Sequence, residues 1–205
     1  MMKILIAVPC MEKVDAFFAR SLAELKRDSD STLQFMVGSL IYESRNALAM
    51  SALEMKADLV LWLDSDMVFD PDLLERLLAD IRSGRDIVTA LYFSRQYPYP
   101  PVIYSKTGFE NDKPVCETYH DYPSDTVFKV EGCGFGAVLM KTRVLADINS
   151  RFDNFFAPLI GFGEDLSFCI RARECGYDIW CDSGIRVGHL GRLTITEDYY
   201  RKLRK

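Results

Sequence analysis

Apolar runs alternate with amphipathic stretches along the first 93 residues of the chain. Two runs, Lys3–Val8 (KILIAV) and Asp58–Leu63 (DLVLWL), are almost continuously apolar, which is typical of strands covered on both faces. The predicted strands are Lys3–Val8, Thr32–Val37, Asp58–Leu63 and Asp86–Tyr92, and the predicted helices are Val14–Lys26, Ser44–Lys56 and Pro71–Ser83, the last capped by Asp70. This alternation predicts an α/β fold with a doubly wound, mostly parallel central sheet flanked by helices. A ligand should then bind outside the carboxyl ends of the strands.

The pattern becomes irregular after Ser94. An aromatic and proline-rich segment, Tyr97–Pro101, leads into the polar stretch Ser105–Asp125, which predicts a loop-rich excursion over one face, a usual place for substrate contacts. Regular patterns then resume, with predicted strands at Val127–Val130, Ala137–Lys141 and Asp178–Cys181 and a predicted helix at Leu166–Cys175. The basic end, Tyr199–Lys205, is more typical of a solvated helix than of a membrane contact. A single domain over residues 1–205 accommodates all these elements.

The charge balance narrows the class of ligand. The 205 residues include 25 Lys and Arg against 30 Asp and Glu, a net charge of −5, whereas proteins that bind a nucleic-acid backbone usually carry a basic field. A hydrophobic content of 49% excludes wholesale disorder, and no apolar run approaches the roughly 18 residues of a membrane helix. The six cysteines form no CxxC pair, so we expect reduced thiols in a cytoplasmic protein. If the ligand of such an acidic protein is an anion, a positive group must neutralise it.

Two carboxylates follow the most apolar predicted strand. Asp64 and Asp66 flank Ser65 directly after LVLWL, and two acids at the end of a buried strand are costly unless they face a cleft or a cation. Strand alternation predicts that both carboxylates lie on one side, where hard oxygen donors suit Mg²⁺ or Mn²⁺ together with substrate phosphates. A polar turn is the structural alternative. A phosphatase of the haloacid dehalogenase kind also uses Asp-x-Asp, but there the pair normally follows the first strand.

A second acidic pair, Glu164 and Asp165, begins a predicted helix. The helix dipole favours acids there and lowers their pKa, so capping alone is a sufficient reason for them. Asp165, however, shares a helix face with Phe168, Cys169 and Ala172, and this stripe should place its carboxylate at the rim of a cleft.

Histidine and glycine supply the remaining candidates. His189 is one of only two histidines and follows the last predicted strand, whereas His120 lies in the polar stretch and has no assigned role. The segment GCGFG at Gly132–Gly136 lacks the spacing of a dinucleotide-binding motif, and we interpret its glycines as allowing close approach of a ligand.

The chain as a whole resembles the GT-A glycosyltransferases, the nucleotide-diphospho-sugar transferase superfamily, and especially its small family 2 members. The similarity rests on segments that occur in the expected order: Lys3–Pro9, Arg45-Asn46 ahead of ADLVLWLDSD, Gly132–Met140 (GCGFGAVLM), GEDLSFC from Gly163 with Arg171-Ala172 and Gly176-Tyr177, and then His189. It covers nearly the whole chain, and it implies a nucleotide-binding half over residues 1–93 and an acceptor and catalytic half over residues 94–205.

The resemblance also implies a role for each candidate residue. It implies that the donor nucleotide is contacted by Pro9, Cys10, Arg45, Asn46, Asp64 and Ser65, and that the sugar and the acceptor are contacted by Gly132, Cys133 and Gly134. Asp66 and His189 would bind the metal, with Asp64 reaching the ribose or a metal-bound water. Asp165, beside Glu164, would be the catalytic base. The implied reaction moves a sugar, of the hexosyl type, from a UDP- or GDP-linked donor to an acceptor hydroxyl with Mn²⁺ or Mg²⁺, and with inversion if Asp165 is the base.

Two other functions fit the same residues. One is a catalytically inert module of this fold that binds a nucleotide sugar or a glycan. The other is a sugar-phosphate nucleotidyltransferase, which usually has a Gly- and basic-rich loop after the first strand, where this chain has Pro9-Cys10-Met11-Glu12.

Overall fold

A seven-stranded sheet forms the centre of the computed structural model, which describes residues 2–27, 30–38, 40–192 and 194–202. Its strands, in spatial order, are β2 (Ser31–Val37), β1 (Ile4–Cys10), β3 (Leu59–Leu63), β10 (Ala137–Lys141), β5 (Ile87–Leu91), β11 (Ile179–Arg186) and β8 (Val127–Val130). Five strands run in one direction, whereas β10 and β8 are antiparallel to their neighbours. The mostly parallel sheet predicted from the sequence is therefore confirmed. Because β10 lies between β3 and β5, both halves of the chain contribute to its centre.

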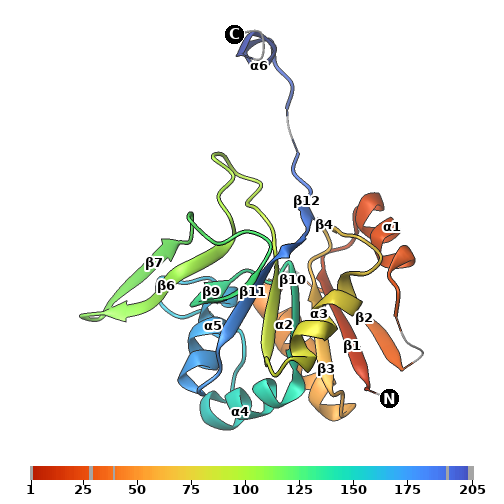
Figure 1. Ribbon diagram of the computed structural model, residues 1–205, viewed down its shortest axis with the longest axis vertical. Coiled ribbons are helices and arrows are strands. Elements are labelled where there is room, and N and C mark those ends of the chain that lie inside the picture. The colour runs from red at the N-terminus through yellow and green to blue at the C-terminus, as the bar shows by residue number, and fades with distance from the viewer. Residues whose placement is uncertain (1, 28–29, 39, 193, 203–205) are drawn as a thin grey trace.

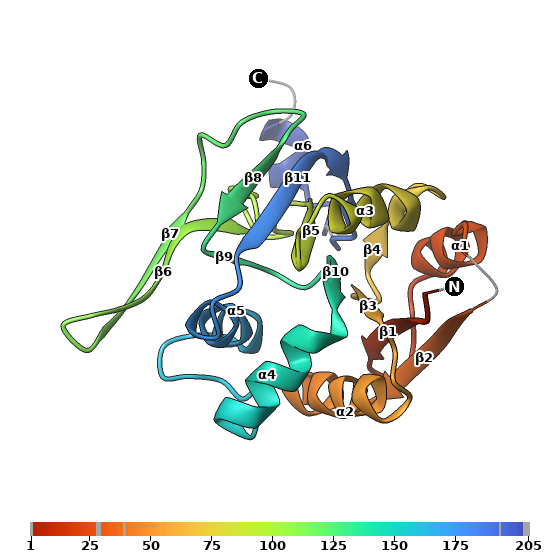
Figure 2. The ribbon, with the colours of Figure 1, turned by 60° about the horizontal axis from the view of Figure 1, so that its bottom comes forward.

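Helices cover both faces of this sheet (Figures 1 and 2). The helices are α1 (Ala16–Glu24), α2 (Ile41–Glu54), α3 (Leu73–Arg82), α4 (Thr142–Phe152), α5 (Glu164–Glu174) and the terminal α6 (Glu197–Lys202). One core contains buried residues of α2, α4 and α5, and the other contains those of α1 and α3. Along β1, Leu5 and Ala7 enter the first core, whereas Ile4, Ile6 and Val8 enter the second. This double burial explains the continuous apolar run KILIAV, since neither face of the strand meets water.

Two smaller sheets complete the fold. One contains β6 (Ile103–Glu110), β7 (Lys113–Thr118) and β9 (Gly132–Cys133), and the other pairs β4 (Met67–Val68) with β12 (Gly188–His189). The irregular loop predicted over Ser105–Asp125 is therefore partly wrong, because β6 and β7 form a hairpin that projects from the body (Figure 1). Asn111 and Asp112 both have positive φ at its turn, as hairpin turns of the primed types require.

The predicted starts of two helices also need correction. α3 begins at Leu73 with Asp72 as its N-cap residue, so the cap predicted at Asp70 is wrong. α4 follows β10 immediately and was missed, because Thr142 begins the helix without a side-chain capping bond or a polar linker that would mark it in the sequence.

Candidate functional site

A cleft of about 370 Å³ opens at the carboxyl ends of β1 and β3. Its walls are Pro9, Cys10, Met11, Gly38, Ile41, Arg45, Asp64, Ser65, Asp66, Arg95, Glu164 and His189. Most residues predicted to hold a nucleotide or a metal therefore meet in one place. Residues outside this lining are Asn46, Asp165, Gly132, Cys133 and Gly134.

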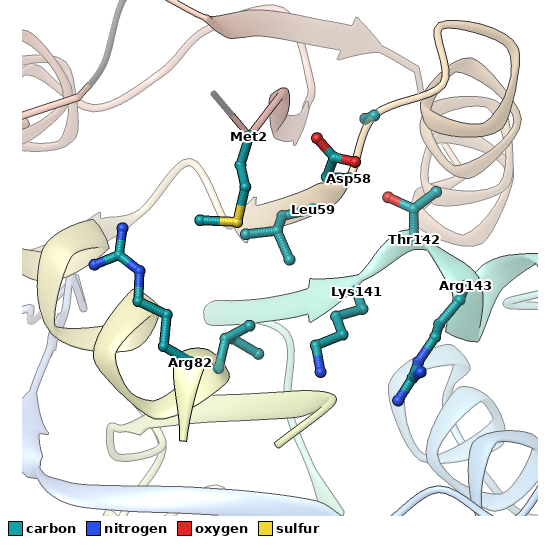
Figure 3. Close-up of a pocket in the computed structure, with 9 residues that line it drawn as sticks. Met2, Asp58, Leu59, Arg82, Lys141, Thr142 and Arg143 are labelled. Carbon is teal, nitrogen blue, oxygen red and sulfur yellow. The ribbon is translucent and has the colours of Figure 1, made fainter. Parts of the chain in front are cut away.

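The cleft is smaller than a cavity of about 860 Å³ at the opposite end of β3 (Figure 3). That larger cavity is bordered by Asp58 and Lys141 and by the first turn of α4, and it contains none of the predicted site residues. Two of its cations are already paired, since Lys141 and Arg143 both contact Asp86, at 3.0 and 2.5 Å. The convergence of acids, histidine and a buried arginine marks the smaller cleft as the candidate site.

Arg45 is the buried centre of the cleft. Only 3% of its side chain is exposed, and it lies 5.0 Å from the ring centre of Phe135. Its Nη2 donates to Asp64 Oδ1 at 2.8 Å, and its Nε lies 3.6 Å from Glu164 Oε1. Burial alone would lower the pKa of Arg45, but these carboxylates and Asp165 raise it. The guanidinium therefore remains charged and holds acids from two distant segments together.

Asp64 and Asp66 occupy a turn between β3 and β4, not a continuous strand. Both carboxylates line the same cleft, as predicted, but strand alternation is the wrong reason because β3 ends at Leu63. Asp64 faces Arg45, and burial raises the pKa of its carboxyl. Burial would likewise raise the pKa of Asp66, but contacts with His189 and Arg95 outweigh it and lower that pKa. Asp66 is thus the more readily ionised of the two.

The pairing of β12 with β4 brings His189 beside Asp66. His189 lies opposite Met67 in this small sheet, and Leu190 N donates to Asp66 O at 2.9 Å. The ring Nδ1 lies 2.9 Å from Phe93 O, and Nε2 lies 3.4 Å from Asp66 Oδ2. The contact with Asp66 raises the pKa of His189. When the proton is on Nδ1, the carbonyl orients the ring and Nε2 presents its lone pair toward Asp66.

This pair fits a divalent cation as a partial ligand set. Over the described parts of the chain, no three His, Cys, Asp or Glu side chains converge as a complete metal site. Asp66 and His189 offer one hard oxygen and one imidazole nitrogen side by side, whereas Asp64 is turned to Arg45. Mg²⁺ and Mn²⁺ sites of this kind are commonly completed by substrate phosphates and water. The role of Asp64 as a metal ligand stays a prediction.

Asp165 lies in the first turn of α5, and the pKa of its carboxyl is raised. Burial and the neighbouring Glu164 raise its pKa to about 6, although Arg45 and the Leu166 N–H, which donates at 2.7 Å, act in the opposite direction. The expectation that the helix start lowers this pKa is therefore wrong, because desolvation outweighs the helix dipole. The predicted inward stripe is confirmed, since the residues that share its helix face are buried: Phe168, Cys169 and Ala172.

The glycine segment is packed against the protein's own side chains. A Cβ on Gly134 would lie 1.9 Å from Tyr92 Oη, and one on Gly136 would lie 2.8 Å from Met67 Cε. Gly132 faces Leu166 in the same way, at 2.8 Å. The space that a side chain would fill at these glycines is therefore occupied by the protein's own core. A sugar or acceptor contact at Gly132, Cys133 and Gly134 stays a prediction.

Two further residues differ from the sequence-based interpretation. Asn46 lies inside α2 and outside the cleft lining, and its Oδ1 accepts from Phe156 N at 2.8 Å. Arg95 was not predicted, yet it contacts Asp66. Its position just after β5, at the carboxyl edge of the sheet, was the available signal.

Comparison with known proteins agrees with this geometry. Residues 43–136 match the model of glycosyl transferase family 2. In structure, the chain is similar to A197 from STIV, with a TM-score of 0.66 and 21% identity over 92% of this chain and 86% of that one. It is also similar to GalNAc-T7 crystallised with UDP, GalNAc and Mn²⁺, with a TM-score of 0.65 and 11% identity over 94% of this chain and 44% of that one. The chain has the GT-A glycosyltransferase fold. The fold that the sequence resemblance implied is thereby confirmed.

Two further proteins are similar to this chain, one in structure and one in sequence. S. aureus TarS residues 1–349, crystallised with UDP-GlcNAc, has a TM-score of 0.59 and 17% identity over 99% of this chain and 65% of that one. The mannan polymerase complex subunit mnn9 of Schizosaccharomyces pombe is 26% identical over 193 residues, 81% of this chain. That match covers 56% of the mnn9 subunit, so the chain spans little more than half of its length. Across the described residues, no helix is long and apolar enough to cross a membrane.

Proposed function

We propose that this GT-A chain is a metal-dependent glycosyltransferase that moves a hexosyl group from a UDP- or GDP-linked donor to an acceptor hydroxyl, with inversion. The observation that carries the proposal is the meeting of Asp66, His189 and the Arg45-held acids in one cleft at the carboxyl ends of β1 and β3. The ligands named for GalNAc-T7 and TarS, UDP with Mn²⁺ and UDP-GlcNAc, support a nucleotide-sugar donor.

The charges of the cleft favour a cation together with an anionic donor. Its lining includes Asp64, Asp66 and Glu164 against Arg45 and Arg95. A bound Mn²⁺ or Mg²⁺ would be held by Asp66 and His189 and would stabilise negative charge on the leaving diphosphate. Pro9, Cys10 and Ser65 would border the nucleoside, since they line the cleft at the ends of β1 and β3.

Asp165 is the candidate general base. Its carboxylate would take the proton from the acceptor hydroxyl as the oxygen bonds to the anomeric carbon, and the diphosphate would leave with the glycosidic electron pair. A pKa of about 6 suits this role at neutral pH, because the group is ionised yet still basic. Attack from the face opposite the leaving group inverts the anomeric centre.

Metal-dependent nucleotide binding tests the proposal. Isothermal titration of UDP and GDP should show binding that strengthens when Mn²⁺ is present. Asp66→Ala should remove most of this dependence, with a loss of roughly tenfold or more in nucleotide affinity at fixed Mn²⁺, because a divalent cation loses its readily ionised ligand.

Asp58→Ala is the matched control. Asp58 precedes the same strand at its opposite end and accepts from Lys3 N at 2.7 Å, so its loss should leave Mn²⁺-dependent binding intact. Equal nucleotide binding by Asp66→Ala and the wild type would refute the metal assignment. Tight binding of a nucleotide sugar without any turnover would favour the inert-module alternative.

The pH profile of turnover is expected to report Asp165. Below pH 6, kcat/KM should fall about tenfold per pH unit as the base becomes protonated, and it should level off above that value. Glu164→Gln removes a negative neighbour that raises this pKa, so the acidic limb should move to lower pH. If Glu164→Gln left the acidic limb of the pH profile unchanged, a group other than Asp165 would control it.

A further inference from the structure

Arg95 forms an ion pair with Asp66, the carboxylate that would bind the metal. Its Nη1 lies 2.5 Å from Asp66 Oδ2, the same oxygen that lies 3.4 Å from His189 Nε2. The contact joins the segment after β5 to the turn before β4, two parts of the chain 29 positions apart. More than half of the Arg95 side chain, 55%, is exposed, so it is free to change rotamer.

A second cavity, of about 350 Å³, shares Arg95 and His189 with the cleft. Its lining is Phe93, Ser94, Arg95, Tyr99, Val187, Gly188, His189, Gly191 and Arg192. These residues, all in the described part of the chain, include two arginines and no carboxylate, although acids outnumber bases in the whole sequence by 30 to 25. Arg95 and His189 border both the cleft and this second cavity.

A divalent cation and the Arg95 guanidinium would compete for Asp66 Oδ2. Two positive groups at such close range repel each other, so a bound cation would drive Arg95 away from Asp66. Among its described lining residues, the adjacent second cavity offers no carboxylate as a new partner. A guanidinium matches the oxygens of a phosphoryl group in a bidentate manner, which makes a phosphoryl group the suitable counter-ion there.

We infer that Arg95 guards Asp66 in the ligand-free protein and moves, when a divalent cation takes Asp66, to bind a phosphoryl group in the second cavity together with Arg192. The inference rests on the proposed metal site. Its consequence is that the cation and the phosphoryl group bind cooperatively. The cation displaces the Arg95 guanidinium from Asp66, and the phosphoryl group then neutralises that guanidinium. The same chemistry is available from a nucleoside diphosphate or from a separate phosphate.

Binding of Mn²⁺ alone provides the first test. Free Mn²⁺ can be titrated by electron paramagnetic resonance with the wild type, Arg95→Gln and Arg192→Gln. We expect Arg95→Gln to bind Mn²⁺ roughly tenfold more tightly than the wild type without any anion, because the competing guanidinium is gone. Arg192→Gln is the matched control, since it removes the same charge from the same cavity without a contact to Asp66. It should keep the wild-type Mn²⁺ affinity.

Added anions provide the second test. Saturating inorganic phosphate or UDP should tighten Mn²⁺ binding to the wild type about tenfold, and this gain should be absent from Arg95→Gln and reduced in Arg192→Gln. A gain with phosphate shows that a separate phosphoryl group suffices, whereas a gain with UDP alone assigns the donor diphosphate. Equal Mn²⁺ affinities of the wild type and Arg95→Gln, or equal tightening by Arg95→Gln and Arg192→Gln, would overturn the inference.

The same titrations separate this inference from the proposed function. Mn²⁺-dependent UDP or GDP binding that Arg95→Gln leaves unchanged supports the function and refutes the guarding role. Phosphate-coupled Mn²⁺ binding that requires Arg95, together with no binding of UDP, GDP or their sugars, supports the guarding role and refutes the function. An absence of Mn²⁺ binding in every variant and with every anion refutes both.

Discussion

Asp165→Asn is expected to lower glycosyl transfer by about 10²–10⁴-fold, the usual contribution of a positioned general base. Asparagine preserves the shape of the side chain and an oxygen that accepts from the Leu166 N–H, but it takes no proton from an acceptor hydroxyl. Because Asp165 does not line the cleft, affinity for the nucleotide should remain within about twofold of the wild type.

The same substitution is expected to stabilise the fold at neutral pH. The pKa of Asp165 is raised in the folded protein to about 6 from 3.8, mainly by burial, so its ionisation costs folding free energy as pH rises from about 4 to 6. The neutral amide of the variant would carry no such cost. The variant should therefore be more stable than the wild type by about 3 kcal/mol at pH 8, and the two should converge near pH 4.

Chemical denaturation at pH 4.5 and pH 8, together with a turnover assay, measures both effects. Asp178→Asn is the control, since Asp178 is an exposed acid that contacts Lys129 on the surface. Its replacement should change neither turnover nor the pH dependence of stability. Undiminished transfer by Asp165→Asn would show that Asp165 is not the base. If the variant and the wild type were equally stable at both pH values, the charge of Asp165 would not be buried in the folded state.

The central strands β1, β3 and β5 were predictable from the sequence because they are buried on two faces. Leu5 and Ile6 point to opposite cores, so the alternation that marks a one-sided strand disappears and a continuous apolar run remains. The hairpin over β6 and β7 was not predictable on the same grounds. Most of its residues are exposed or half-buried on both faces, so their polar composition carries no period.

Much of the candidate site was predictable because the carboxyl ends of parallel strands meet at one edge. Pro9 lies near the end of β1, and Asp64 and Asp66 come directly after β3. The topology of the sheet alone therefore places these residues together. Side-chain partners were not predictable in this way. The contact of Arg45 with Asp64 spans 19 positions, and the packing of Tyr92 against Gly134 depends on strands that are distant in the chain. Such pairings are set by tertiary packing.

Arg45→Met is expected to lower the free energy of unfolding by about 3 kcal/mol, because loss of one partner leaves buried charge uncompensated. Asp64 and Glu164 would then face each other without the guanidinium that contacts both. For a chain of this length the melting temperature should fall by about 6–12 °C. The deficit should be larger at pH 8 than at pH 5, since Arg45 opposes the effect of burial on the pKa of Asp64, and ionised carboxylates gain most from it.

Arg20→Met provides the control for this prediction. Arg20 contacts Glu24 at 2.9 Å on an exposed face of α1, and such surface pairs contribute about 0.5 kcal/mol or less. Adding Asp64→Asn to Arg45→Met should restore part of the lost stability, because it removes one of the stranded charges. If Arg45→Met were no less stable than Arg20→Met, the guanidinium would not be the group that holds the acids of β3 and α5 together. The cleft would then owe its arrangement to the apolar packing of Phe135 and Phe156 around it.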